Sequence, residues 1–245
     1  MSMQPVRALV LALAVVAPLS GVASPVSAFS PRSTASVFEV FRQVAKVDEA
    51  LAQTLIKAYR EGGYKALTQA MEGVTDKSSI GAIFLRVAAT EGKIADEEAA
   101  VLLQTLHTVP GFERAARQLL VSSSNLTGAL QELRAAQKLT DAGATVKFIR
   151  MPFKDMGKAG VSDIDMVAVI NSRTVAIESK AYAAPMRWDQ ISADADTLLH
   201  FKEINPSAVG CFLFLTKPTE LALEMLERKG LKAVWGDPAM ARYCA

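Results

Sequence analysis

Acidic residues and a lysine stand at the ends of two apolar runs between Asp163 and Lys180. The first run opens with Asp163-Ile-Asp165, and the second closes with Glu178-Ser-Lys180. Carboxylate oxygens are hard ligands that suit a divalent ion such as Mg²⁺, and the lysine would place a cation next to that ion. These residue types therefore indicate a divalent-metal site with a cation beside it, if the chain brings the two groups together.

A β-hairpin is the element that would bring them together. Both runs are rich in Val and Ile, and the segment between them, 171–173, begins with the turn-favouring residues Asn and Ser. Side chains two apart on a strand share a face, so Glu178 and Lys180 lie on one face of the second strand. Antiparallel pairing then predicts Asp165 beside both of them at one end of the hairpin.

The same alternation assigns the faces of the first strand. Asp163 and Asp165 would point one way, and Ile164 and Met166 the other. Carboxylates this close repel one another, which a metal ion between them would relieve.

This pattern resembles the PD-(D/E)xK nuclease superfamily, whose core is a helix with a Glu, a strand ending near an Asp, and a strand carrying (D/E)-x-K. Glu178-Ser-Lys180 matches the last element, and Asp165 matches the preceding Asp in position. Ile164 stands where the family's Pro would be, and Asp163-Ile-Asp165 is similar to branches with an acidic-x-Asp pair there. The resemblance covers roughly the C-terminal half of the chain.

The resemblance implies a nuclease that hydrolyses phosphodiester bonds of DNA or RNA with Mg²⁺ or Mn²⁺. Asp165 and Glu178 would bind the metal, with Asp163 as a further ligand or a neighbour of the ligands. Lys180 would orient the attacking water or stabilise charge on the phosphate. Because the superfamily includes members that lost catalysis, the alternative is an inactive binding or interaction module with the same fold.

Glu132 is the candidate for the family's helix Glu. It falls within the helix predicted for residues 126–142, and at 100° per residue it lies in an apolar arc. A charged side chain in such an arc needs a partner. It is either an edge residue that reaches solvent or a metal ligand, directly or through water. The arc consists of Ala129, Leu133, Ala136 and Leu139.

Four polar residues are candidates for binding the nucleic acid. Arg150, Lys154 and Lys158 belong to a predicted loop with a Pro and two Gly, and they either contact phosphates or are solvated. Gln190 resembles a Gln that some superfamily members carry on the helix after E-x-K. Residues 125–245 hold fifteen Lys and Arg against fourteen Asp and Glu, so any phosphate-binding surface must be a local patch.

The periodicities predict alternating helices and strands over residues 125–245, in the order that the resemblance implies for a restriction-endonuclease-like α/β domain with a mixed central sheet flanked by helices. It is preceded by an all-α domain over residues 29–124, whose role the sequence does not reveal. The polar segment 122–125 marks the boundary between them. The chain of 245 residues is 51% apolar and 21% charged, which is typical of folded domains.

Residues 1–28 have the features of a secretory signal peptide: one charge at Arg7, an apolar stretch, and small residues at Val26-Ser-Ala28. We expect a mature chain from near Phe29, secreted or periplasmic, with no stable membrane anchor. An uncleaved anchor and a harmless apolar leader are the alternatives. An exported nuclease with a helical front half resembles bacterial toxins delivered to competitors, which implies a cognate inhibitor protein as partner.

The chain contains two Cys and two His, which excludes a zinc-finger type of site. Cys211 lies in a predicted buried strand and Cys244 near the C-terminus. A disulfide after export and a buried free thiol are equally compatible with this placement.

Overall fold

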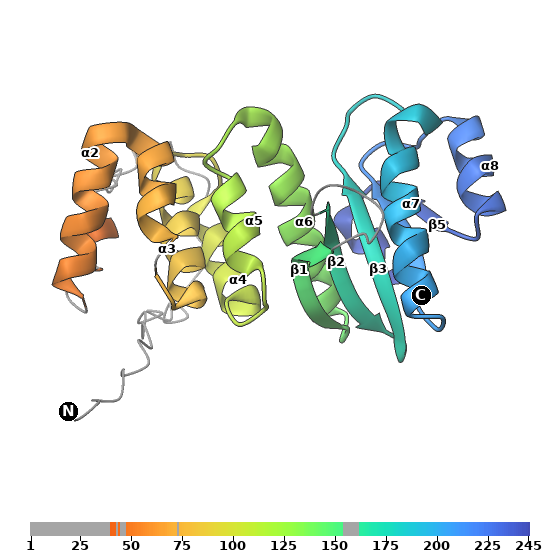
Figure 1. The fold of residues 1–245 in the computed structure, drawn as a ribbon, viewed down its shortest axis with the longest axis horizontal. Helices are drawn as coiled ribbons and strands as arrows, with labels where there is room; N and C mark the ends of the chain where they lie inside the picture. Colours follow the sequence, from red (N-terminus) through yellow and green to blue (C-terminus); the bar gives the residue numbers. More distant parts are fainter. Residues whose placement is uncertain (1–39, 43, 45–47, 73, 154–161) are drawn as a thin grey trace, which may run out of the picture.

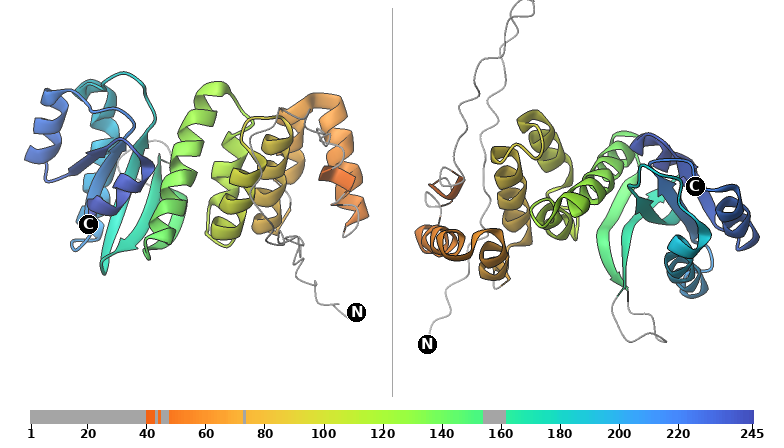
Figure 2. Two further views of the ribbon diagram at one scale, coloured as in Figure 1. Left: turned by 180° about the vertical axis from the view of Figure 1, so that it is seen from behind. Right: turned by 90° about the horizontal axis from the view of Figure 1, so that it is seen from above.

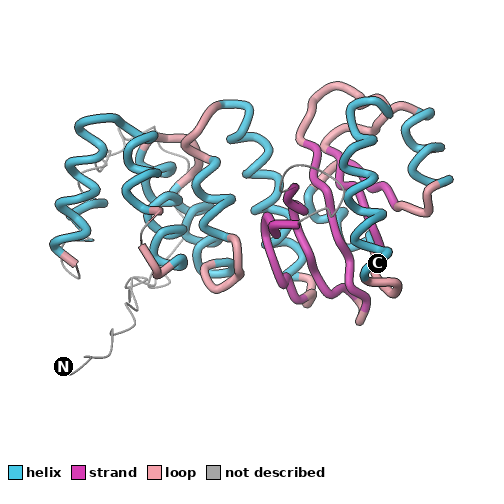
Figure 3. Tube along the Cα trace, viewed as in Figure 1, coloured by secondary structure: helices cyan, strands magenta, loops and turns pink. Residues whose placement is uncertain are grey.

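The computed structural model describes residues 40–42, 44, 48–72, 74–153 and 162–245. Helices fill the described part of the chain before residue 123, and strands occur only after α6 (Figure 3). The well-defined helices of this first half are α2 (Glu49–Met71), α3 (Lys77–Thr90), α4 (Asp96–Leu106) and α5 (Phe112–Gln118). The expectation of a helical N-terminal region is therefore confirmed.

Local sequence explains where these helices begin and bend. Asp48 caps α2, since its side chain accepts a hydrogen bond from the backbone N–H of Leu51 at 2.9 Å. α2 bends at Gly62 and Gly63, and Gly63 has a φ of 57° that a side chain would disfavour. Three acidic residues occupy the first turn of α4, where they complement the helix dipole.

The second half contains the sheet. Its elements are α6 (Ser123–Asp141), β1 (Thr145–Phe153), β2 (Ser162–Ile170), β3 (Arg173–Lys180), α7 (Trp188–Ile204), β4 (Val209–Phe214), α8 (Glu220–Arg228), β5 (Lys232–Trp235) and the 3-10 helix η1 (Pro238–Cys244). The spatial order of the strands is β1-β2-β3-β4-β5. The first three are antiparallel, and β4 and β5 run parallel to β3. The predicted mixed sheet flanked by helices is confirmed.

Helices cover both faces of this sheet (Figures 1 and 2). α6 and η1 pack on one face, and their apolar residues form a core with β1 to β4. α7 and α8 pack on the other face around Phe212 and Phe214. Cys211 of β4 and Cys244 of η1 form a disulfide that ties the C-terminal 3-10 helix to β4. Of the two alternatives for these cysteines, the structure has the disulfide.

The helical half and the sheet half share one apolar core, which runs from α2 through α5 into α6 and β1. A turn between α4 and α5 also binds β1 directly, because the carbonyl of Pro110 accepts a hydrogen bond from the N–H of Ile149 at 2.9 Å. Gly111 has a φ of 86°, and a Cβ there would lie 1.7 Å from the Ile149 carbonyl oxygen. Only glycine fits this close approach.

No helix in the described ranges is long and apolar enough to cross a membrane. The signal peptide predicted for residues 1–28 lies outside the part of the chain that the structure describes.

Candidate functional site

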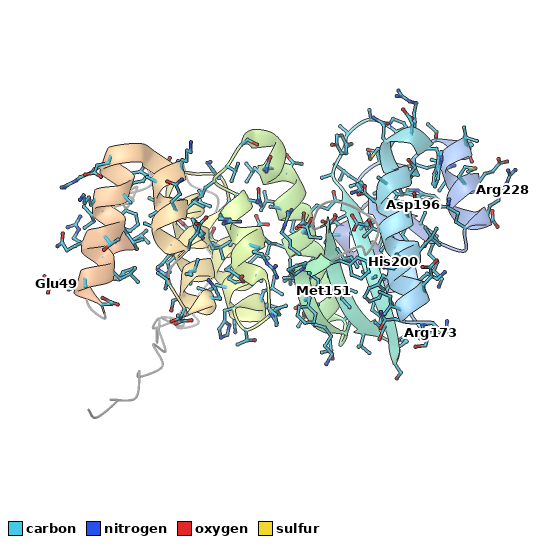
Figure 4. The ribbon with its side chains drawn as sticks, in the orientation of Figure 1. Glu49, Met151, Arg173, Asp196, His200 and Arg228 are labelled. Carbon is cyan, nitrogen blue, oxygen red and sulfur yellow. A yellow bond between two sulfur atoms is a disulfide. The ribbon has the colours of Figure 1, made fainter. Side chains whose placement is uncertain are left out.

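The β2–β3 hairpin carries the predicted site at the end opposite its turn. Asn171 and Ser172 form the turn with φ values of 49° and 64°, a left-handed pair that matches the twist of a two-residue hairpin. The ladder runs from Ile170–Arg173 to Met166–Ile177. Arg173, labelled in Figure 4, marks the turn end, so the acidic residues lie at the far end of the two strands.

Glu178 and Lys180 lie side by side on the face of β3 that α7 covers. Their strand neighbour Ala176 belongs to the core under α7, and alternation carries both side chains to the same side. The Lys180 Nζ lies 3.2 Å from Glu178 Oε2 and 2.8 Å from Asp194 Oδ2 on α7. Glu178 is only 3% exposed, so its carboxylate depends on this lysine for compensation.

Asp165 joins this group across the hairpin. Its Oδ2 accepts a hydrogen bond of 2.8 Å from the backbone N–H of Ser179, so the carboxylate is held against the residue between Glu178 and Lys180. The side chain is buried. The alternation predicted for β2 is wrong at its start, because Ile164 packs into the core under α7 and Met166 into the core under α6.

Glu132 extends the cluster from the α6 side. It is 5% exposed, so it is not an edge residue that reaches solvent. The Arg150 Nη1 lies 3.2 Å from Glu132 Oε1, and the same guanidinium contacts Asp163 Oδ2 at 2.9 Å through Nη2. Arg150, predicted to bind substrate, thus binds two of the predicted metal-site carboxylates in this structure.

Burial makes these carboxylates reluctant to ionise. It raises the pKa of Glu132, and the neighbouring charge of Asp165 raises it further. Burial also raises the pKa of Asp165 and of Glu178. Burial alone would lower the pKa of Lys180, but the charges of Glu178 and Asp165 outweigh it and raise that pKa, so the lysine stays protonated. Lys180 is thus the charged partner of Glu178 and Asp165 within the cluster.

The donor set fits a Mg²⁺ ion held by few protein ligands. Glu178 Oε1 is buried and has no hydrogen-bond partner among the described residues, although a carboxylate oxygen is a strong acceptor. Within the same residues, no group of three or more His, Cys, Asp or Glu side chains is arranged to hold a metal ion. Arg150 and Lys180 lie among the carboxylates instead. One or two carboxylates with water and substrate phosphate suffice for Mg²⁺, and Asp165 and Glu178 supply them.

The other predicted substrate contacts lie apart from this cluster. Lys154 and Lys158 fall outside the described residues. Gln190 is exposed, and its side chain accepts a hydrogen bond from the backbone N–H of Arg187 at 2.8 Å, which makes it a helix cap of α7. Its side-chain oxygen therefore caps the start of α7.

Asp194 is the residue at the site that sequence reasoning missed. On α7 it lies at 100° per residue between Leu198 and Phe201, which are both buried. A charged residue within an apolar arc was the signal that identified Glu132, and the same reasoning would have found Asp194.

Comparisons with known proteins do not assign a family to this site. No protein-family model matches the chain, and no curated protein matches it. The solved structure of protein VC1899 from Vibrio cholerae is similar at a TM-score of 0.31 and 13% sequence identity. The likeness covers 88% of this chain and 55% of that one, so the chain spans about half the length of that protein. A likeness this low carries no argument about fold or function.

Proposed function

We propose that the protein is a metal-dependent nuclease with a restriction-endonuclease-like C-terminal half, acting on phosphodiester bonds of DNA or RNA. One observation carries the proposal: Asp165 and Glu178 are buried beside Lys180, and Glu178 Oε1 has no partner among the described residues. Burying two carboxylates costs free energy that a purely structural core would avoid. A cation-binding role explains why the chain retains them.

The residues divide the chemistry between them. A bound Mg²⁺ would polarise the scissile phosphate and make water a better nucleophile. Asp165 and Glu178 would hold that ion, with Glu132 and Asp163 close enough to add their charge. Lys180 is held by Glu178 and Asp194 and stays charged, so it would stabilise negative charge on the phosphate rather than act as a base.

Export to an oxidising compartment is a second part of the proposal. The Cys211–Cys244 disulfide supports it, because such bonds persist mainly outside the reducing cytosol. A secreted or periplasmic nuclease of this kind would act on foreign nucleic acid or as a toxin with a cognate inhibitor protein.

The test is cleavage by the purified protein. We expect it to degrade plasmid DNA or total RNA with Mg²⁺ or Mn²⁺ and to stop in EDTA, and Asp165→Asn and Glu178→Gln to abolish cleavage. As a control, Asp237→Asn changes a carboxylate that caps η1. Nucleic-acid binding without cleavage under any metal would reject the enzyme and favour an inactive binding module.

A further inference from the structure

We infer that Arg150 is a built-in counter-ion of the carboxylate cluster, which a divalent metal must displace and which then becomes free to contact the substrate phosphate. This inference rests on the proposed function.

Two carboxylates hold the guanidinium of Arg150. Its guanidinium bridges two elements: Nη1 faces both carboxylate oxygens of Glu132 at 3.2 and 3.4 Å, and Nε and Nη2 face Asp163 at 3.0 and 2.9 Å. An arginine fork across two carboxylates is a strong, directed arrangement. The Arg150 side chain is 22% exposed and that of Glu132 6%, so solvent screens this pair weakly.

The backbone of Arg150 has an unusual conformation for a residue within a strand. Arg150 has a φ of 52°, although its neighbours Ile149 and Met151 pair in register with β2. A left-handed residue other than glycine inside a strand is unfavourable and persists only where the surroundings impose it. Here the turn at Pro110 and Gly111 fixes Ile149, so the helical half holds the backbone just before Arg150.

A divalent metal would compete with Arg150 for the carboxylate cluster. Glu132 and Asp163 hold the guanidinium, and a divalent ion at the neighbouring Asp165 and Glu178 would repel it. Electrostatic coupling between Asp165 and Glu132, and between Asp165 and Arg150, places that charge within reach. Arg150 reaches the surface in part, so it can turn outward to a phosphate without crossing the core.

The matched pair of variants for the test is Arg150→Met and Arg134→Met. Arg134 is also an arginine held by a glutamate, since it contacts Glu98 Oε1 at 2.6 Å, and that pair lies between α6 and α4. Arg150→Lys is the milder companion, because it keeps a charge but loses the fork. Thermal melts of the metal-free proteins would check that each variant folds.

The experiment measures Mn²⁺ affinity by calorimetry on the full chain and KM for a DNA or RNA oligonucleotide. We expect Arg150→Met to bind Mn²⁺ about tenfold tighter and to raise KM about tenfold, magnitudes typical of residues that contact metal ligands. Arg150→Lys should fall between this variant and the wild type, and Arg134→Met should change neither value. Unchanged or weaker Mn²⁺ binding in Arg150→Met would overturn the inference.

The readouts separate this inference from the proposed function. If Asp165→Asn weakens Mn²⁺ binding but Arg150→Met does not strengthen it, the inference fails and the nuclease proposal stands. If Arg150→Met binds Mn²⁺ more tightly but the wild type cleaves no substrate, the nuclease proposal fails and the counter-ion role stands. If Asp165→Asn leaves Mn²⁺ binding unchanged, the metal site is elsewhere and both are wrong.

Discussion

The ammonium of Lys180 on β3 lies 2.8 Å from the carboxylate of Asp194 on α7. This contact connects the hairpin to the helix that covers it, and it holds the lysine between Asp194 and Glu178. The lysine is therefore the cation that makes two buried carboxylates tolerable in the metal-free protein.

Lys180→Met should destabilise the metal-free protein. It leaves Glu178 and Asp165 buried without their nearest cation, and breaking a buried pair in this way costs about 3 kcal/mol or more. Asp194→Asn should cost less, because the Asp194 side chain is 38% exposed. Chemical denaturation in EDTA measures both. Equal stability of Lys180→Met and the wild type would mean that the lysine has no compensating role.

Removing the carboxylates should have the opposite effect on stability. Asp165→Asn with Glu178→Gln relieves repulsion and desolvation, so the metal-free protein should unfold at an equal or higher temperature. The same double variant should lose about 100-fold or more in cleavage rate, since the metal supplies several kcal/mol of transition-state stabilisation. A large loss of metal-free stability would instead make these residues structural.

Stability without metal should fall as the pH rises. The folded protein holds protons on Glu132, Asp165 and Glu178 above the pKa values of the unfolded chain. The stability that these protons contribute is therefore complete below the ordinary glutamate pKa of 4.5. It is lost as the pH rises through the raised pKa values of the folded protein. Arg150 and Lys180 oppose these shifts.

Melts in EDTA from about pH 5 to about pH 8 measure this dependence. The fall of melting temperature with pH should be shallower in the double variant Asp165→Asn with Glu178→Gln, which lacks two of the three carboxyl groups. Saturating Mg²⁺ should also remove most of this pH dependence, since the metal replaces the protons on the carboxyl groups. A rise in stability over the same range would contradict the raised pKa values.

The disulfide should contribute strongly to stability in an oxidising buffer. Cys211 and Cys244 are separated by 33 residues, and closing a loop of that length stabilises by roughly 3–4 kcal/mol in the chain-entropy model. Cys244→Ser should lose this amount, and dithiothreitol should lower the melting temperature of the wild type but not of the variant. A wild type insensitive to reduction would mean that the bond contributes little.

Much of this arrangement could be predicted because it depends on short-range patterns. The hairpin follows from two β-branched runs around Asn171-Ser172, and α6 follows from a 3.6-residue apolar period. Glu132 was identified by a local conflict, a charge inside an apolar arc. The mixed sheet was expected because the order of helices and strands along the chain matches the order that the superfamily resemblance implies.

The parts that escaped prediction depend on contacts between distant segments. Arg150, which forms the salt bridge to Glu132, is a left-handed residue within β1, and the sequence, with its Pro and Gly, predicts a loop there. The fixation of Ile149 by Pro110 and Gly111 joins two halves that the sequence presents as separate. Gln190 had the right residue type, but capping of its own helix took its side chain.

The contact of Gly111 with Ile149 also sets the smallest portable piece of this molecule. A fragment cut at residue 125 would lose the carbonyl that accepts the Ile149 N–H, and it would uncover the apolar side of α6 that α4 and α5 protect. A fragment that keeps this contact must also keep α3, which packs against α5, so it must begin before Lys77. Gene fusions that exchange the front of the protein must therefore leave both this turn and α3 intact.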